Sequence, residues 1–151
     1  MTRRQTMPEQ WLIIDRTSDR PMWSSLRRLP CGGSVLLLQA PDSSEERRVR
    51  RLARVRSLKV LTEGPRTAAR VHNMRELRSA LLRRTPLVLL SPIYPTSSHP
   101  EWQPLPRMRA ATLARFAGRT AIALGGMNRK RHAKIAPLGF IGWAGISAFR
   151  T

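Results

Sequence analysis

The sequence predicts an α/β protein built around a parallel sheet. Two continuous apolar runs, SVLLLQA (34–40) and PLVLLS (86–91), are typical of strands that are buried on both faces. Amphipathic helical patterns alternate with these and other short apolar runs, and this alternation favours parallel strands joined by helical crossovers. Over 151 residues, which we expect to form a single domain (1–151), the seven strand candidates fit either a barrel or an open doubly wound sheet.

The individual elements follow from local patterns. The helix expected over 43–57 has Ser43 and Glu46 at capping-box spacing, with Val49, Leu52, Ala53 and Val55 on its apolar side. Asn73 is expected to cap a helix that buries Met74, Leu77 and Leu81. The other helices are expected from Met22, over 107–118 and over 128–138, and the strands over 11–15, 34–40, 58–62, 68–72, 86–91, 119–124 and 140–147.

One junction departs from this alternation. Only the five residues EGPRT (63–67) separate the third and fourth strand candidates. A crossover between parallel neighbours needs a dozen or more residues. Either one of the two segments is not a strand, or a helix–strand unit is absent between them.

The net charge restricts the partners. The chain has 28 Lys and Arg against 9 Asp and Glu, a net charge of +19, which attracts nucleic acid, acidic membranes or phosphorylated ligands. The aromatic residues do not alternate with basic clusters as nucleic-acid stacking platforms do, and the charge is spread over most helices. Nucleic-acid binding is therefore kept as an alternative to phosphorylated small molecules. The sequence does not indicate an oligomeric state.

The sequence also indicates a location. No apolar run approaches the ~18 residues that a membrane span requires. The N-terminal segment lacks the apolar stretch of a signal peptide. The single cysteine, Cys31, cannot form a disulfide within the chain. We therefore expect a cytoplasmic protein without a membrane partner.

Two turns have the composition of anion-binding loops. Gly125 and Gly126 follow one strand candidate, and Ile146 and Ser147 end the next. Glycines allow a backbone to approach a phosphate closely, and the amides of a following helix point toward it. A tight strand–helix turn explains the same glycines without a ligand. Arg129, Lys130 and Arg131 (129–131) either face a bound phosphate or form a solvated basic face.

Several of these segments resemble the thiamine-phosphate synthase and TenI family. LVLLSPIYPTSSHP, AIALGGM and GWAGISAF resemble its last three strands, and LIID and LLLQ resemble its first two. RVHNMRELRSALLRRTPLVLLSPI resembles its fifth strand, fifth helix and sixth strand. The resemblance, clearest over 68–149, implies a shortened (βα)8 TIM-barrel-like fold. EGPRT then lies where the third helix and fourth strand are missing.

The resemblance implies a reaction and its binding residues. Synthases of this family join an aminopyrimidine diphosphate to a thiazole phosphate, with Mg²⁺ assisting the departure of diphosphate. By position, the resemblance assigns the diphosphate to Gln39, Thr96, Ser98 and His99, where His99 replaces the family's lysine. It assigns the thiazole phosphate to Gly125, Gly126, Ile146 and Ser147.

Other positions depart from the family pattern. The family's metal-binding aspartates follow its third and fourth strands, and none of Asp15, Asp19 and Asp42 matches them. Glu63 is the candidate Mg²⁺ ligand, although a solvated loop glutamate is the favoured explanation. His72 is either a substrate contact or, the favoured interpretation, a helix-entry or packing residue. Pro92 replaces the tautomerase histidine, which disfavours tautomerase activity. A non-catalytic phosphate-binding protein is the alternative to a transferase.

Overall fold

The computed structural model describes residues 7–15, 20–38, 43–97 and 99–150. Its strands form one seven-stranded sheet in the order β3-β2-β1-β7-β6-β5-β4, and every neighbouring pair is parallel. Opening a closed barrel between its third and fourth strands gives this order. The strands are β1 (Gln10–Ile14), β2 (Ser34–Leu37), β3 (Lys59–Thr62), β4 (Ala68–Val71), β5 (Leu87–Leu90), β6 (Ala121–Leu124) and β7 (Gly142–Gly145).

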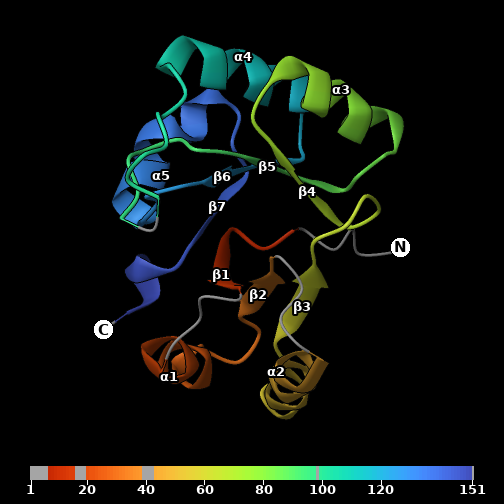
Figure 1. Cartoon of the computed structure of the whole chain (residues 1–151), viewed down its shortest axis with the longest axis vertical. Coiled ribbons are helices and arrows are strands. Elements are labelled where there is room, and N and C mark those ends of the chain that lie inside the picture. Colours follow the sequence, from red (N-terminus) through yellow and green to blue (C-terminus); the bar gives the residue numbers. More distant parts are fainter. Residues whose placement is uncertain (1–6, 16–19, 39–42, 98, 151) are drawn as a thin grey trace.

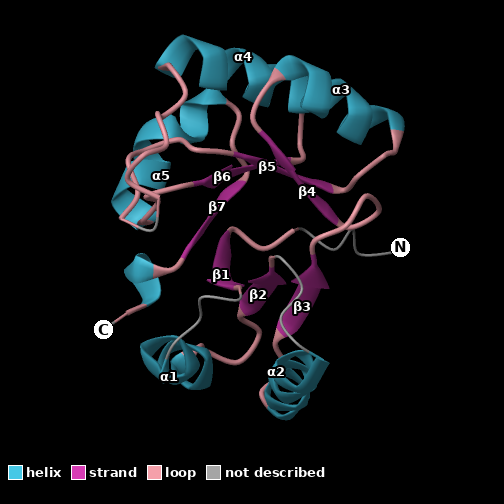
Figure 2. Cartoon of the chain, viewed as in Figure 1, coloured by secondary structure: helices cyan, strands magenta, loops and turns pink. Residues whose placement is uncertain are grey.

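The helices lie outside the curled sheet (Figure 1). Figure 2 shows α1 and α2 beside β1–β3, whereas α3, α4 and α5 lie around β4–β7. This arrangement confirms the predicted shortened TIM-barrel-like fold. The α-helices are α1 (Arg20–Arg28), α2 (Ser43–Val55), α3 (Met74–Leu82), α4 (Arg107–Ala117) and α5 (Arg129–Ile135); Ala136–Leu138 and Ser147–Phe149 are short 3₁₀ helices.

The β3–β4 junction contains no helix. The amide of Glu63 still donates to the Leu37 carbonyl (2.8 Å), so residue 63 extends the pairing of β3 with β2. Gly64 then forms an antiparallel bridge with Ala68, the first residue of β4. Both predicted strands therefore exist, but they are the two edges of the sheet and not neighbours. This agrees with the predicted absence of a helix–strand unit.

Side-chain alternation along each strand builds a core with an inside and an outside. Trp11 and Ile13 of β1 belong to the interior cluster, while Leu12 and Ile14 pack outward against the cluster beneath α1 and α2. The interior cluster also receives buried residues from β2, β4, β5, β6 and β7. Each large apolar side chain buried in this way contributes roughly 1.5–3 kcal/mol relative to exposure.

Some details of the predicted helices are wrong. Val55 is 79% exposed and Leu81 is 37% exposed, although both follow the apolar period of their helices. Val55 is the last residue of α2, and α3 buries Leu77 and Ala80 in place of Leu81. Ser43 is the first residue of α2 and not the residue before it. Among the helices in the described ranges, none combines the length and apolar character that a membrane crossing requires.

Candidate functional site

A cavity of about 540 Å³ lies at the carboxyl ends of the strands. Residues that directly follow strands line it: Asp15 after β1, Leu38 after β2, Ser91 after β5, Gly125 after β6 and Ile146 after β7. Ligand sites of parallel α/β barrels lie at this end, because the loops that follow the strands converge there. The predicted location of the site is therefore occupied by a real cavity.

The glycine turn after β6 is shaped by the loop opposite it. Gly125 and Gly126 have φ values of 101° and 59°. A Cβ on Gly126 would lie 2.3 Å from the Pro95 carbonyl oxygen, so close packing against the 92–95 segment alone requires glycine there. The carbonyls of Leu124 and Gly125 accept hydrogen bonds from the amides of Ile93 (3.0 Å) and Tyr94 (3.1 Å).

This pairing fixes the polar groups of the turn. Arg131 donates from Nη1 to the carbonyl of Gly126, so three successive carbonyls of the turn are engaged. Within the described residues, no backbone hydrogen bond uses the amides of Gly126 or Met127. Gly126 and Met127 line the cavity, and their amides are therefore available to an anion.

Arg131 is the member of the basic 129–131 run that reaches the cavity. Asn128 caps α5 by accepting from the Arg131 amide (2.9 Å). The Arg131 guanidinium lies 4.7 Å from the centre of the Tyr94 ring, a cation–π contact. Arg129 and Lys130 are exposed. The sequence pattern does not distinguish the three residues. In the structure, Arg131 lines the cavity and Arg129 and Lys130 are exposed to solvent.

Ile146 and Ser147 form the turn after β7. Both line the cavity, and Ser147 begins the 3₁₀ helix Ser147–Phe149. That helix is held from two sides: the Ser25 hydroxyl donates to the Phe149 carbonyl (2.7 Å), and the Phe149 ring stacks on Trp143 with centroids 5.3 Å apart. Ser147 is therefore presented by a fixed turn.

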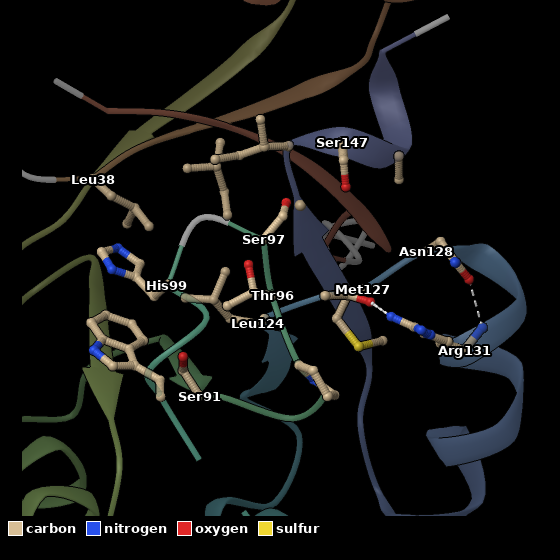
Figure 3. A pocket seen from close by; sticks show the side chains of 18 of the residues that line it. Leu38, Ser91, Thr96, Ser97, His99, Leu124, Met127, Asn128, Arg131 and Ser147 are labelled. Carbon is tan, nitrogen blue, oxygen red and sulfur yellow. Dashed lines mark hydrogen bonds between the residues drawn. The ribbon is translucent and has the colours of Figure 1, made fainter. Parts of the chain in front are cut away.

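The segment after β5 supplies the other wall. Thr96, Ser97, His99 and Trp102 line the cavity. The His99 and Trp102 rings are stacked with centroids 3.9 Å apart and planes 7° from parallel. In Figure 3, His99 and Leu38 lie on one side of the cavity and Ser147, Asn128 and Arg131 on the other, with Thr96 and Ser97 between them. Gln39 and Ser98 lie outside the described residues.

The charged residues of the cavity include some that sequence reasoning missed. Arg70 of β4, Arg150 and Asp15 line it, together with Arg131. Asp15 had a usable signal, because it directly follows the buried run WLII. Three arginines against one aspartate give the described lining a positive field, which favours an anionic ligand.

The described residues offer few carboxylates that a Mg²⁺ ion could use. Glu63, the predicted ligand, is not among the lining residues; its Oε1 lies 2.8 Å from Nε of Arg70. In the described ranges, no group of three or more His, Cys, Asp or Glu side chains could hold a metal ion. Mg²⁺ is usually held by one or two protein carboxylates together with substrate phosphates. Asp15 is the one carboxylate among the described lining residues.

His72 serves the start of α3. Its amide and its Nδ1 contact Oε2 of Glu76 at 2.7 and 3.1 Å, and Glu76 donates its own amide to Asn73 (2.9 Å). Burial alone would raise the pKa of Glu76, but the hydrogen bonds from the His72 amide, the His72 ring and Asn73 outweigh it and lower the pKa below its ordinary value. His72 is not among the residues that line the cavity, which agrees with the helix-entry interpretation.

Strand order, outer helices and a basic cavity at the carboxyl ends of the strands define a shortened TIM-barrel-like α/β protein. No family model and no curated protein matches the sequence. Solved structures share the fold, among them two thiamine phosphate pyrophosphorylases. A thiamine phosphate pyrophosphorylase from Pyrococcus furiosus superposes with a TM-score of 0.70 at 14% identity, covering 93% of this chain and 86% of its own.

The second structure is a thiamine phosphate pyrophosphorylase from Bacteroides thetaiotaomicron. Its TM-score is 0.56 at 15% identity, and the match covers 94% of this chain and 84% of the other. At such low identities the likeness establishes the fold. Function resides in a site and not in the fold that carries it.

Proposed function

We propose that this chain is a thiamine-phosphate synthase-like transferase that joins an aminopyrimidine diphosphate to a thiazole phosphate. One observation carries the proposal: a single cavity is lined by Thr96 and His99 on the wall after β5 and by Gly126 and Ser147 on the turns after β6 and β7. These are residues for which the sequence resemblance implied two different phosphate groups. The fold shared with two thiamine phosphate pyrophosphorylases supports the same class.

The reaction asks for electrostatics and positioning. The carbon–oxygen bond to diphosphate breaks, and its electron pair leaves with the diphosphate. The nitrogen lone pair of the thiazole then forms the new bond to the pyrimidine-bearing carbon. No proton is transferred in these two steps, so an acid–base pair is not required. Backbone amides, hydroxyls and guanidinium groups that hold the charged groups in place suit such a reaction.

Each wall of the cavity would bind one of the two phosphate-bearing groups. The amides of Gly126 and Met127, the Ser147 hydroxyl and the Arg131 guanidinium would hold the thiazole phosphate. The wall after β5, with the Thr96 hydroxyl and the His99 ring, would face the diphosphate. Bringing both ligands into one cavity converts a bimolecular encounter into a positioned reaction.

A turnover assay tests the proposal. The protein is incubated with both substrates, once with Mg²⁺ and once with a chelator, and thiamine phosphate is quantified by chromatography. We expect thiamine phosphate to form. We expect Ser147→Ala to raise the KM for the thiazole phosphate roughly tenfold, because the substitution removes a hydrogen bond to a charged group. Ser79→Ala, which changes an exposed serine on α3, is the matched control. A folded protein that neither forms product nor binds the thiazole phosphate would overturn the proposal.

A second candidate is a phosphate-ligand-binding protein without catalysis. The observation that favours it is the poor match of the described carboxylates to a metal site. The same assay separates the two. Calorimetric binding of thiazole phosphate that is lost in Ser147→Ala, with no product under any condition, would select the non-catalytic protein.

A further inference from the structure

Arg70 is an interior residue of an edge strand. On β4, Ala68 belongs to the interior cluster. Val71 belongs to a second outer cluster, which lies beneath α3 and α4 and includes Leu77 and Leu113, and Ala69 packs against it. Because side chains alternate along a strand, Arg70 faces the interior with Ala68, and it lines the cavity. Its side chain is only 25% exposed. A charge in such a position is costly unless it is paired.

The partner of Arg70 comes from the shortened junction. Glu63 precedes the 64–68 bridge and Arg70 follows it, and the turn brings Oε1 of Glu63 to 2.8 Å from Nε of Arg70. This contact uses Nε, and among the described residues the two terminal nitrogens of the guanidinium form no hydrogen bond or ion pair. Glu63 orients the planar fork, and the cavity is lined by the arginine and not by the glutamate.

Arg70 also lies beside the wall that faces the proposed diphosphate. Its register partner on β5 is Leu89. The carbonyl of the next residue, Val71, accepts a hydrogen bond from the backbone amide of the buried Ser91 (3.1 Å). Ser91 and Thr96 line the same cavity. A guanidinium fork next to hydroxyl groups can donate several hydrogen bonds at once to the oxygens of a diphosphate.

We propose that this cavity binds diphosphate without a divalent metal ion, and that Arg70 supplies the positive charge that Mg²⁺ would otherwise bring. The inference rests on the proposed function for the identity of the substrate and adds the source of the neutralising charge. Oε1 of Glu63 is engaged by Arg70, so a cation on that oxygen would compete with the arginine. The short junction thus brings an arginine that is held by a carboxylate to the cavity.

Calorimetric titration with inorganic pyrophosphate tests the inference, in chelator and in Mg²⁺, at about 150 mM salt so that general attraction is screened. We expect binding in chelator that Mg²⁺ does not strengthen. Arg70→Gln should weaken it roughly tenfold or more, and Arg70→Lys by less, because lysine keeps the charge without the fork. The control Arg119→Gln removes the same charge from an exposed position outside the cavity and should change the affinity less than twofold.

A further variant guards against loss of fold. Glu63→Gln removes the negative charge but keeps a side-chain oxygen that can accept from Nε of Arg70, so the fork stays oriented and pyrophosphate binding in chelator should be retained. Thermal unfolding is recorded for every variant, and affinities are compared among folded proteins. Binding that requires Mg²⁺, or equal losses in Arg70→Gln and Arg119→Gln, would overturn the inference.

Titration with thiazole phosphate keeps this inference separate from the proposed function. If thiazole phosphate binds through Ser147 but pyrophosphate needs Mg²⁺, the metal-free diphosphate site is wrong and the transferase proposal stands. If pyrophosphate binds through Arg70 in chelator while thiazole phosphate does not bind and no product forms, the transferase proposal fails and the diphosphate site stands. If neither ligand binds, both are wrong.

Discussion

Nδ1 of His132 on α5 lies 3.2 Å from Oε1 of Glu9, in the segment that leads into β1. The other ring nitrogen, Nε2, lies 3.4 Å from the carbonyl oxygen of Phe140, just before β7. Nearby, the Trp143 amide donates to the Glu9 carbonyl (2.8 Å). The last crossover helix is thus tied to the first strand at the place where β1 and β7 pair.

The contact between His132 and Glu9 should contribute measurably to stability. His132 is buried, while the Glu9 side chain is 58% exposed, so we expect a coupling of about 0.5–1 kcal/mol in a double-mutant cycle with Glu9→Gln and His132→Gln. Urea unfolding gives the four free energies. Glu101→Gln, which removes the exposed His99–Glu101 contact, should cost nothing measurable. A coupling energy indistinguishable from zero would show that the contact between His132 and Glu9 does not stabilise the fold.

Gly126 should be the least replaceable glycine of the site. Gly126→Ala places a Cβ 2.3 Å from the Pro95 carbonyl oxygen, so the 92–95 segment or the turn must move. Gly32→Ala is the matched control, because Gly32 also has a positive φ (83°) but nothing within 4 Å of an added Cβ. We expect about 1 kcal/mol from the positive φ in the control and about 2 kcal/mol more at Gly126, measured by urea unfolding. Equal losses at the two positions would contradict the close approach seen here.

Arg131 should matter for phosphate binding where its neighbour does not. Arg131 lines the cavity, and Arg129 on the same helix is exposed. We expect Arg131→Gln to weaken thiazole phosphate binding roughly tenfold, the effect of losing a charge-assisted hydrogen bond, and Arg129→Gln to weaken it less than twofold. Calorimetry measures both. Similar effects of the two substitutions would mean that the general charge of the protein, and not this side chain, attracts the ligand.

The start of α3 should respond to acid. The lowered pKa of Glu76 means that its ionised form is favoured by folding. Its contribution to stability is therefore present above the pKa of the unfolded chain and is lost as the pH falls through the lower pKa of the folded state. Glu76→Gln should lower stability near neutrality and converge with the parent protein in acid. Unfolding as a function of pH measures this, with Glu46→Gln, which removes an ordinary i,i+4 ion pair, as the control. A gap between Glu76→Gln and the parent that persists unchanged in acid would contradict the assignment.

Much of the fold could be predicted from the sequence because the strands are short and almost wholly apolar. Runs such as those around Val35 and Val88 are buried on both faces, so their composition reveals them. The short 63–67 junction also predicted the interrupted barrel, because chain length limits what a crossover can span. The exposure of Val55 could not be predicted, since a helical period does not show where the surface beneath the helix ends.

The site was less accessible to sequence reasoning. The cavity-facing turns at Gly126 and Ser147 follow strands, and the rule that sites lie at strand ends is sufficient to find them. The roles of Arg70 and Trp102 depend on side chains that meet across strands and loops. Alternation from Ala68 gives the direction of Arg70, but its contact with Glu63 depends on the geometry of a turn. The stacking of His99 on Trp102 likewise results from the path of a loop.

The order of the strands has a mechanical consequence. Among the described residues, the β1–β7 ladder is the one set of strand hydrogen bonds that joins β1–β3 to β4–β7, because β3 and β4 are both edges. The cavity draws residues from both sides of this seam, with Asp15 and Leu38 on one side and Gly126 on the other. A ligand that contacts both walls therefore links the two groups of strands. Amide hydrogen exchange along β1 and β7 should slow when such a ligand binds.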